Sequence, residues 1–296
     1  MEERCLVLAC VTLESSWVNC PPALTNTLNV GPVADALVEY SLRQNPDIGT
    51  LKSGASSVNV VVGETNDGWL NDLQGRHVKA GHVWAAIEWA SSNAVAEGNV
   101  GAGTGTCCFG WKGGLGTSSR ILPEQAGGFT LGALVQANFG RAEDLMICGA
   151  LLGKHIRPDE FEKSVWPDSR GSIMTVLATD APLDSRQLRR LCARVAAGLA
   201  RVGSHLSHGS GDFVIAFSTA DRVEHPPQML TKTRTVLADE ERVMNWLFRA
   251  VIESVEEAVL NSLFQAETMT GRDGHTAHGL PVEQVVSFVL SHQAQP

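Results

Sequence analysis

Hydrophobic residues along the chain gather in short continuous runs and in long segments of helical periodicity. The continuous runs predict strands that are buried on both faces of a sheet. They span residues 57–64, 130–139, 144–150, 173–179 and 213–219. Apolar residues recur on one helical face of residues 185–201, and they repeat every four positions from 239 to 269. The pattern therefore predicts an α/β (α+β) protein in which helices pack against sheets.

The beginning of the sequence, MEERCLVLACVTL, also contains an apolar run. Acidic residues precede this run, and it lacks the basic region and the small-residue cleavage site of an export signal. Nowhere does the chain reach the roughly 18 consecutive apolar residues of a membrane-spanning helix. We therefore predict a buried strand at the start, no membrane partner, and a soluble, cytoplasmic protein.

Length and charge narrow the class of protein further. The chain has 296 residues, of which 44% are hydrophobic, and this is long enough to bury a substantial core. Its formal net charge is −9, and its Lys and Arg residues are scattered rather than gathered in a stripe. Both features argue against a protein that binds a phosphate backbone. The length fits one large domain or two modest ones. We predict a single domain, 1–296, and no nucleic-acid partner.

Residues that could bind a metal ion or a nucleotide do not form the usual motifs. The seven cysteines show neither CxxC nor zinc-ligand spacing, and the adjacent Cys107 and Cys108 cannot easily chelate one ion. The nine histidines form no HExxH motif. Gly98–Gly116 is rich in glycine but matches neither the GxGxxG nor the GxxxxGKS/T phosphate-binding pattern. We therefore predict no metal and no organic cofactor.

The segment Arg170-Gly171-Ser172 holds the candidate chemistry and leads directly into the predicted strand 173–179. If the Gly171–Ser172 bond were cut, the new α-amine, with a reference pKa of about 8, would be an internal base for the Ser172 hydroxyl. Gly171 has no side chain, so its carbonyl carbon is open to attack. The preceding residues 160–170 are polar and contain a proline, which predicts an exposed linker. The residues alone also fit an ordinary turn before a strand.

A series of sequence blocks carries a resemblance to one known family. In order, the blocks are ALTNT, ETNDGWLND, EGNVGAGTG, WKGGLGTSSR, LGALVQANFG, RGSIMTVLATDAPLDSRQLRRLCARVAAGLARVG, HGSGDFVIAFSTA and ETMTGRDGHTAHGLP. They resemble the self-processing L-aminopeptidase D-esterase/amidases and β-peptidyl aminopeptidases, from about Pro21 to about Val285. The resemblance implies a four-layer αββα sandwich of N-terminal-nucleophile-like type. It also implies autocleavage into chains 1–171 and 172–296.

The resemblance implies a set of catalytic side chains. Ser172 is the nucleophile of both self-cleavage and hydrolysis. Ser210 and Asp212, two positions apart at the opening of a strand, point to the same side and hold its amine and hydroxyl. Asn138, at the end of a strand, stabilises the oxyanion with its amide. From the residues alone, 209–212 also fits an Asx-type turn and Asn138 a strand-end cap. Many relatives carry Glu in place of Asp212.

The same resemblance implies a substrate cleft near Trp69, Glu97, Asn99 and Gly101. Relatives often place tyrosine where this chain has Trp69, which offers an N–H donor but no hydroxyl. The implied substrates are short peptides, amides or esters with small N-terminal residues, including β-amino acids and D-alanine derivatives. The implied assembly is a homo-oligomer of processed αβ pairs.

Two alternatives to aminopeptidase activity remain open. The first is acyl transfer of the kind that ornithine acetyltransferases perform, although those enzymes use a threonine nucleophile and this chain has Ser172. The second is a non-catalytic, unprocessed member of the family. This second alternative is motivated by Trp69 and by residues 1–20, which do not resemble the longer N-terminal segment of the relatives.

Overall fold

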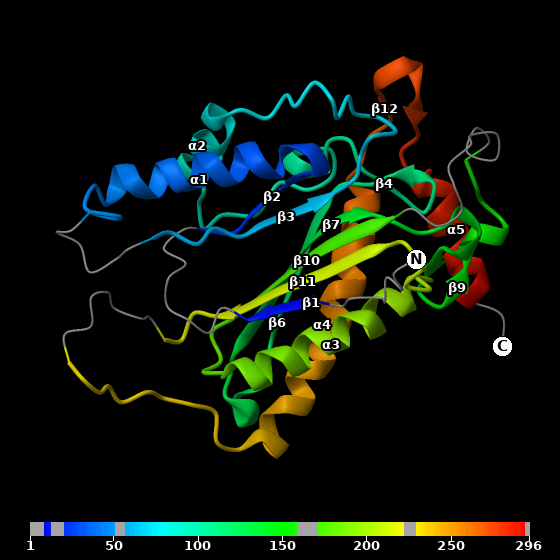
Figure 1. Cartoon of the computed structure of the whole chain (residues 1–296). Coiled ribbons are helices and arrows are strands. Elements are labelled where there is room, and N and C mark those ends of the chain that lie inside the picture. The colour runs from blue at the N-terminus through cyan, green and yellow to red at the C-terminus, as the bar shows by residue number, and fades with distance from the viewer. Residues whose placement is uncertain (1–8, 13–20, 51–56, 159–170, 222–228, 294–296) are drawn as a thin grey trace.

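The computed structural model describes residues 9–12, 21–50, 57–158, 171–221 and 229–293 (Figure 1). The largest sheet consists of β1 (Ala9–Thr12), β6 (Leu115–Ile121), β7 (Thr130–Asn138), β10 (Ser172–Thr179) and β11 (Gly211–Ser218). Its strand order is β1-β11-β10-β7-β6. β1, β11 and β10 are parallel, whereas β7 is antiparallel to both of its neighbours, β10 and β6.

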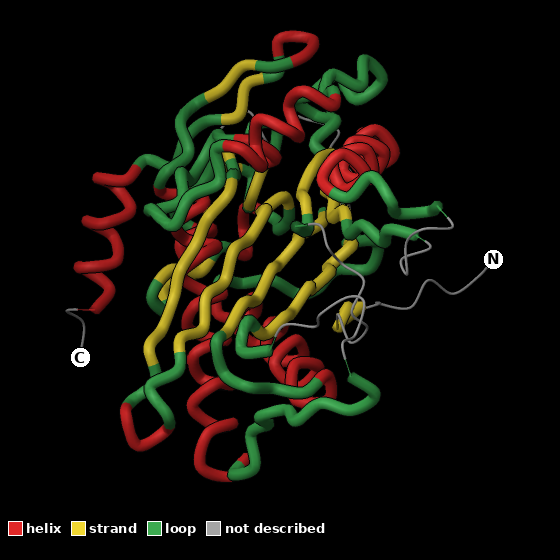
Figure 2. The backbone as a smooth tube through the Cα atoms, turned by 90° about the vertical axis from the view of Figure 1, so that its left-hand side faces the viewer, coloured by secondary structure: helices red, strands yellow, loops and turns green. Residues whose placement is uncertain are grey.

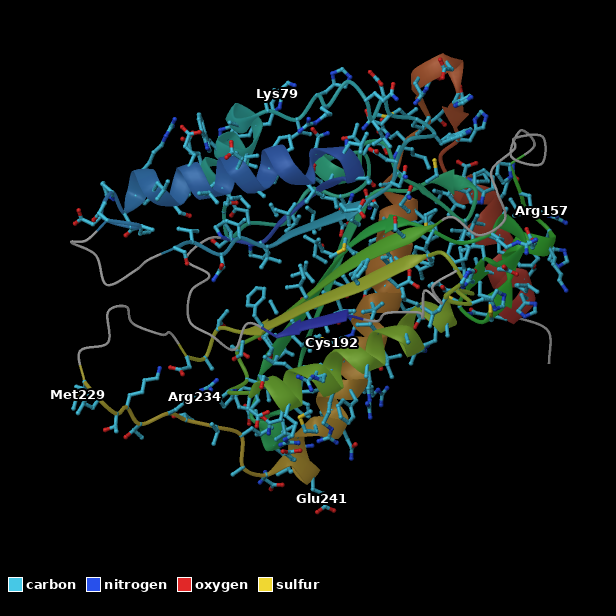
Figure 3. The ribbon with its side chains drawn as sticks, in the orientation of Figure 1. Lys79, Arg157, Cys192, Met229, Arg234 and Glu241 are labelled. Atoms are coloured by element: carbon cyan, nitrogen blue, oxygen red, sulfur yellow. The ribbon has the colours of Figure 1, made fainter. Side chains whose placement is uncertain are left out.

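Two helices, α3 (Ser185–Arg201) and α4 (Glu240–Phe264), cover one face of this sheet (Figures 1 and 2). α3 begins with a capping box in which Asp184 and Gln187 exchange side-chain to backbone hydrogen bonds of 2.7 and 2.9 Å. Cys192, labelled in Figure 3, is fully buried on α3. The apolar sides of both helices and of the sheet form the main core. Each fully buried aliphatic side chain contributes about 1.5–3 kcal/mol to its stability.

A second group of elements covers the opposite face of the sheet. They are β2 (Ala23–Asn26), β3 (Val62–Thr65), α1 (Val30–Gln44) and α2 (Ala80–Glu88). β2 and β3 form a parallel pair, which lies between the large sheet and the two helices (Figure 1). The pair contacts the large sheet closely, because a Cβ at Gly63 would lie 2.5 Å from Met174 Cε. Val33, Leu37 and Val83 form a separate small core under the helices.

The remaining elements are short strands, 3-10 turns and one helix near the end of the chain. The strands are β4 (Cys107–Cys108), β5 (Trp111–Lys112), β8 (Met146–Ile147), β9 (Ala150–Leu151), β12 (Met269–Thr270) and β13 (Thr276–Ala277). The 3-10 turns span Thr27–Asn29, Gly101–Gly103, Glu124–Ala126, Ala142–Asp144, Leu152–Lys154 and Arg272–Gly274, and α5 spans Val282–Gln293. None of the helices in the described ranges has the length and hydropathy of a membrane span.

The strongest patterns in the sequence correspond to observed elements. The runs at 130–139, 173–179 and 213–219 are β7, β10 and β11, and the periodic segment 185–201 is α3. The predicted initial strand is present as β1, at the edge of the sheet. The described residues confirm an α/β fold with helices packed on sheets.

The predicted boundaries of one helix and two strands need correction. The helix predicted over 239–269 ends at Phe264. Of the run 57–64, only Val62 to Glu64 is strand, within β3. The strand predicted over 144–150 is wrong, because Cys148 and Gly149 have φ angles of 51° and 80° and turn the chain between β8 and β9. The predicted linker 160–170 lies outside the described residues.

β6 lies directly on the backbone of α4. Gly116 makes this possible, because a Cβ at this position would lie 1.9 Å from the carbonyl oxygen of Ala258 and 2.6 Å from the nitrogen of Ser262. Next to it, Asn261 Nδ2 donates a 2.9 Å hydrogen bond to the carbonyl oxygen of Thr117. β6 and α4 can therefore approach this closely only because position 116 has no side chain.

Candidate active site

Ser172 is the first residue of β10, the central strand of the large sheet. Its register partners are Asn138, the last residue of β7, and Gly211, the first residue of β11. Ser172 is 8% exposed, and its Oγ accepts a 3.3 Å hydrogen bond from the backbone N–H of Asn66. Three strand ends thus bring the predicted nucleophile and the predicted oxyanion residue side by side.

The carbonyl of Gly171 is held at the same edge of the sheet. Its oxygen accepts a 3.1 Å hydrogen bond from the backbone N–H of Gly211. A Cβ at Gly171 would lie 2.9 Å from Phe139 Cα and 3.3 Å from the carbonyl oxygen of Asn138. The peptide before Ser172 therefore has a polarised carbonyl and occupies a space that excludes a side chain.

The side-chain amide of Asn138 is oriented by hydrogen bonds at both of its ends. Its Oδ1 accepts from the backbone N–H of Cys107 at 3.0 Å, and its Nδ2 donates to the carbonyl oxygen of Asn66 at 3.0 Å. The side chain is 3% exposed. Because an amide nitrogen carries two hydrogens, Asn138 retains one further donor. Sequence reasoning missed Asn66, although it lies within the ETNDGWLND block.

Ser210 and Asp212, which the resemblance placed beside the nucleophile, form a hydrogen-bonded pair with each other. Ser210 Oγ donates to Asp212 Oδ1 at 2.7 Å. Asp212 is 4% exposed, and burial raises the pKa of its carboxyl, against the lowering effect of the Ser210 hydrogen bond. Its second oxygen, Oδ2, has no hydrogen-bond partner among the described residues. A buried carboxylate oxygen without a partner is costly, so this atom has the capacity to accept a donor.

The sheet register separates these side chains into two groups. Ser172 is paired with Gly211, so Asp212 lies beside Ile173 rather than beside the nucleophile. Because side chains alternate between the faces of a strand, the Ser172 hydroxyl and the Asn138 amide share one face, and Asp212 lies on the other. The backbone of Ser172 lies in the sheet between the two groups. This arrangement suits Asp212 for contact with the backbone nitrogen of Ser172 more than with its hydroxyl.

Two buried ionisable groups that the sequence did not predict lie close behind the site. Asp67 is 5% exposed, its oxygens accept hydrogen bonds from Asn71 Nδ2, and burial raises its pKa to about 6. Lys112 is fully buried, and burial lowers its pKa to about 8. Lys112 stands between Trp111 and two glycines, where a charge is unusual, whereas Asp67 lies in a polar block, ETNDGWLND, that gives no sign of its burial.

A cavity of about 830 Å³ opens beside Asp67. Its walls are mostly apolar and come from α1, α2 and the residues around β2, with polar atoms from Asp67 and Asn71. Gly101, which the resemblance placed near the substrate cleft, lines this cavity. Asp67 of the cavity wall directly follows Asn66, whose backbone N–H contacts the Ser172 hydroxyl, although neither Asn66 nor Ser172 lines the cavity.

The other residues implied for the cleft make contacts that hold segments together. Glu97 Oε1 accepts hydrogen bonds from the backbone N–H and hydroxyl of Thr117, at 2.6 and 2.7 Å. Asn99 exchanges hydrogen bonds with the backbone of Glu267, at 2.8 and 3.2 Å. Trp69 stacks on His275 with ring centroids 5.0 Å apart. None of the three is among the described residues that line the cavity.

The comparisons with known proteins place this chain in a family. A model of peptidase family S58 matches residues 10–277. The chain belongs to peptidase family S58. This S58 peptidase is 39% identical to the beta-peptidyl aminopeptidase BapA of Sphingosinicella microcystinivorans, over 95% of this chain and 71% of that protein. The resemblance that the sequence blocks carry is therefore confirmed.

Solved structures agree with this assignment. A Burkholderia sp. beta-aminopeptidase is 36% identical and superposes with a TM-score of 0.81, covering 94% of the S58 peptidase and 76% of its own chain. The L-aminopeptidase D-Ala-esterase/amidase of Ochrobactrum anthropi is 34% identical, with a TM-score of 0.83 over 92% and 74% of the two chains. The latter is described as a prototype of the serine aminopeptidases and a variant of the Ntn hydrolase fold. The S58 peptidase is thus a hydrolase of the aminopeptidase class with an Ntn-like fold.

The buried thiols of the S58 peptidase lie in an environment that disfavours the thiolate. Burial raises the pKa of the Cys107 thiol to about 12, and it raises that of Cys108 as well. A thiol with so high a pKa is a poor nucleophile at neutral pH. Among the described residues, no group of three or more His, Cys, Asp or Glu side chains is arranged to hold a metal ion.

Asp67 makes the stability of the S58 peptidase depend on pH. Its folded-state pKa of about 6 lies above the ordinary value of 3.8, so folding favours the protonated carboxyl. The contribution of Asp67 to the free energy of unfolding is therefore fully present below about pH 4 and is lost as the pH rises through 6. Asp67→Asn removes this loss. Relative to the original protein, the variant is expected to gain about 2–3 kcal/mol of unfolding free energy between pH 4 and pH 8.

Urea denaturation at the two pH values measures this gain. Asp35→Asn, which changes an exposed carboxylate on α1, is the matched control and is expected to show no comparable dependence. An equal effect of Asp67→Asn at both pH values would contradict the assignment of a raised pKa to this group.

Proposed function

We propose that this S58 peptidase is an autoprocessing serine aminopeptidase in which Ser172 becomes an N-terminal nucleophile after cleavage of the Gly171–Ser172 bond. The observation that carries the proposal is the position of Ser172 between Asn138 and Gly211, with its hydroxyl and the preceding carbonyl each held by a backbone N–H. Membership in a peptidase family favours hydrolysis over both acyl transfer and a non-catalytic role.

The geometry around Gly171 supports the proposed cleavage. Ser172 Oγ attacks the Gly171 carbonyl carbon, whose oxygen already accepts a hydrogen bond from the Gly211 N–H. The C–N bond breaks, the hydroxyl proton passes to the departing amine, and an ester joins Gly171 to Ser172 Oγ. Water then hydrolyses the ester, which leaves a carboxylate on Gly171 and a free hydroxyl and amine on Ser172.

The same atoms then act on a substrate. The free α-amine of Ser172 takes the proton from its own hydroxyl, and Oγ attacks the first amide or ester carbonyl of the substrate. The remaining Nδ2–H of Asn138 stabilises the oxyanion on the face of the sheet that carries Oγ. The unpartnered Oδ2 of Asp212 accepts a hydrogen bond from the amine. Transfer of the proton to the leaving group releases it, and water hydrolyses the acyl-enzyme.

Substrate class and assembly are further parts of the proposal. We propose short peptides, amides or esters with small N-terminal residues as substrates. The names of the relatives support a β-amino acid, an L-amino acid or D-alanine at the N-terminus. The cavity beside Asp67 is large enough for such a molecule. We further propose a single domain of four αββα layers, a homo-oligomer of processed pairs, a cytoplasmic location and no cofactor. Glu97 and Asn99 would hold the segments around the cleft in place through their hydrogen bonds, and Trp69 would do so through its stacking on His275.

Intact-mass spectrometry under denaturing conditions tests the cleavage. Two masses whose sum equals that of the precursor plus one water, the smaller one beginning at Ser172, are expected. The processed protein is then assayed with p-nitroanilides of β-alanine, D-alanine and L-alanine. A single full-length mass, or a processed protein that hydrolyses none of these anilides, would remove the support for the proposal.

Gly171→Ala is expected to slow the cleavage by at least about tenfold. A Cβ at this position would lie 2.9 Å from Phe139 Cα, so the carbonyl would have to move away from Ser172 Oγ and the Gly211 N–H. A displacement of this kind costs about one to two orders of magnitude in rate. The time course of the two fragment masses after synthesis measures the effect.

Gly132→Ala, on β7, is the matched control. A Cβ there has its nearest neighbour at 4.0 Å, so cleavage is expected at the original rate. Equal rates for Gly171→Ala and the original protein would show that the space around Gly171 has no part in the cleavage.

A further inference from the structure

Lys112 carries a buried charge that the mechanism above does not use. It lies on β5 and is fully buried. Its Nζ donates to the carbonyl oxygens of Gly103 at 2.9 Å, Thr106 at 2.9 Å and Gly113 at 2.6 Å, so all three ammonium hydrogens are used. A lysine is seldom buried this completely, and removing the charge from water is costly. Its position therefore calls for a role that a neutral side chain cannot fill.

One of these carbonyls belongs to a peptide group that contacts the site. The oxygen of the Thr106–Cys107 peptide accepts from Lys112, and the N–H of the same peptide donates to Asn138 Oδ1 at 3.0 Å. The amide of Asn138 in turn presents its Nδ2 hydrogens on the face that carries the Ser172 hydroxyl. A continuous path thus joins the ammonium group to the oxyanion donor through one peptide bond.

The path has a consistent polarity. The positive charge of Lys112 draws electron density from the Thr106 oxygen, which makes the Cys107 N–H a stronger donor. That donor draws density from Asn138 Oδ1, which leaves the Nδ2 hydrogens more positive. Conjugation within each amide and the low dielectric of the interior make such polarisation larger than it is in water.

The surroundings fix the peptide in this orientation. The Thr106 oxygen also accepts a 3.0 Å hydrogen bond from the Gly113 N–H, and the backbone N–H of Lys112 donates to the His278 oxygen at 2.7 Å. The titratable groups that face Lys112 are Asp67 and the thiols of Cys107 and Cys108. Both thiols have raised pKa values, so Asp67 is the one negative charge among these three groups near neutral pH.

We propose that Lys112 is a positioning residue that orients and polarises the Asn138 amide through the Thr106–Cys107 peptide and thereby increases the stabilisation of the oxyanion. The inference rests on the proposed function, in which Asn138 is the oxyanion donor. Lys112 itself touches neither the substrate nor the reacting atoms. Loss of its charge weakens the amide donor rather than removing it.

The pH dependence of kcat distinguishes this role from structural support. Deprotonation of the Ser172 α-amine makes kcat rise with pH, because the amine acts as a base. Burial lowers the pKa of Lys112 to about 8, so the loss of its proton makes kcat fall above this pH. Lys112→Met keeps an unbranched side chain that is one atom shorter, and it has no charge at any pH. It is expected to lower kcat at pH 7 by about 10- to 100-fold, to leave KM within about twofold, and to abolish the alkaline fall.

The experiment compares the original protein, Lys112→Met, Asn138→Ala and the double variant, with kcat expressed per mole of chain that begins at Ser172. If Lys112 acts through Asn138, the double variant is expected to be no slower than Asn138→Ala alone. In Asn138→Ala alone, the decrease of kcat at alkaline pH is expected to disappear. This measurement leaves Lys112 unchanged, so it tests the inference even if Lys112→Met fails to fold. An alkaline fall that persists in Asn138→Ala, or additive effects in the double variant, would overturn the inference. An original protein that is neither cleaved nor active would instead overturn the proposed function.

Discussion

Ser172→Ala is expected to leave the chain in one piece and to reduce hydrolysis of amino-acid anilides by at least about a thousandfold. In the proposed mechanism this hydroxyl attacks Gly171, so its removal is expected to prevent formation of both the ester and the free amine. Both the nucleophile and its base are then missing, and loss of a covalent nucleophile costs several orders of magnitude in rate. Denaturing intact mass and initial hydrolysis rates measure the two effects separately.

A conservative variant tests whether the hydroxyl group matters in itself. Ser172→Cys places a thiol at the same point of β10 and is expected to retain slow cleavage at the same bond. In Ser172→Ala, the Asn66 N–H loses its hydrogen-bond acceptor. This loss lowers the free energy of unfolding by only about 1–3 kcal/mol, so circular dichroism should show a folded protein. A Ser172→Ala protein that is cut between Gly171 and residue 172, or that hydrolyses the anilides at the original rate, would disprove the assignment of the nucleophile.

Gly116→Ala is expected to lower the free energy of unfolding by more than about 3 kcal/mol. Its Cβ would overlap the carbonyl oxygen of Ala258 at 1.9 Å, an atom of the α4 backbone that cannot rotate away. β6 and α4 would have to separate, which breaks the hydrogen bond between Asn261 and Thr117 and opens the core along the whole strand. Urea denaturation in the Ser172→Ala background, where unfolding involves one chain, measures the change.

Gly132→Ala is again the appropriate comparison. It adds the same methyl group to the neighbouring strand, where the nearest atom is 4.0 Å away, and is expected to change stability by less than about 1 kcal/mol. If both variants unfolded at the same urea concentration, the close contact between β6 and α4 would not be needed for stability.

The sequence predicts those elements whose pattern is set locally. α3 is found with both of its predicted ends, because its apolar stripe is regular and Asp184 with Gln187 forms a capping box. α1 escaped prediction, although Val33 and Leu37 repeat at helical spacing, because Gly31 and Pro32 obscure its beginning. The turn between β8 and β9 depends on a positive φ at Cys148, a conformation that the residue type does not indicate.

In the candidate site, too, local sequence indicates some residues and only the fold indicates others. Ser172, Ser210, Asp212 and Asn138, each at or next to the end of a strand, were predicted from the blocks that carry the family resemblance. Asn66 and Lys112 were not, because their roles arise from contacts that only the fold creates. Asn66 lies 106 positions from Ser172 in the chain, and no local pattern relates the two residues.

The strand order of the large sheet has a consequence for the protein after cleavage. A cut before Ser172 assigns β1, β7 and β6 to one fragment and β10 and β11 to the other, so the two strands of the second fragment lie between strands of the first. The uncut chain brings these strands together in a single-molecule reaction, whereas separated fragments must first meet. The proposed cleavage would therefore turn a protein that can refold alone into one whose recovery after unfolding slows with dilution, and folding would have to be complete before the chain is cut.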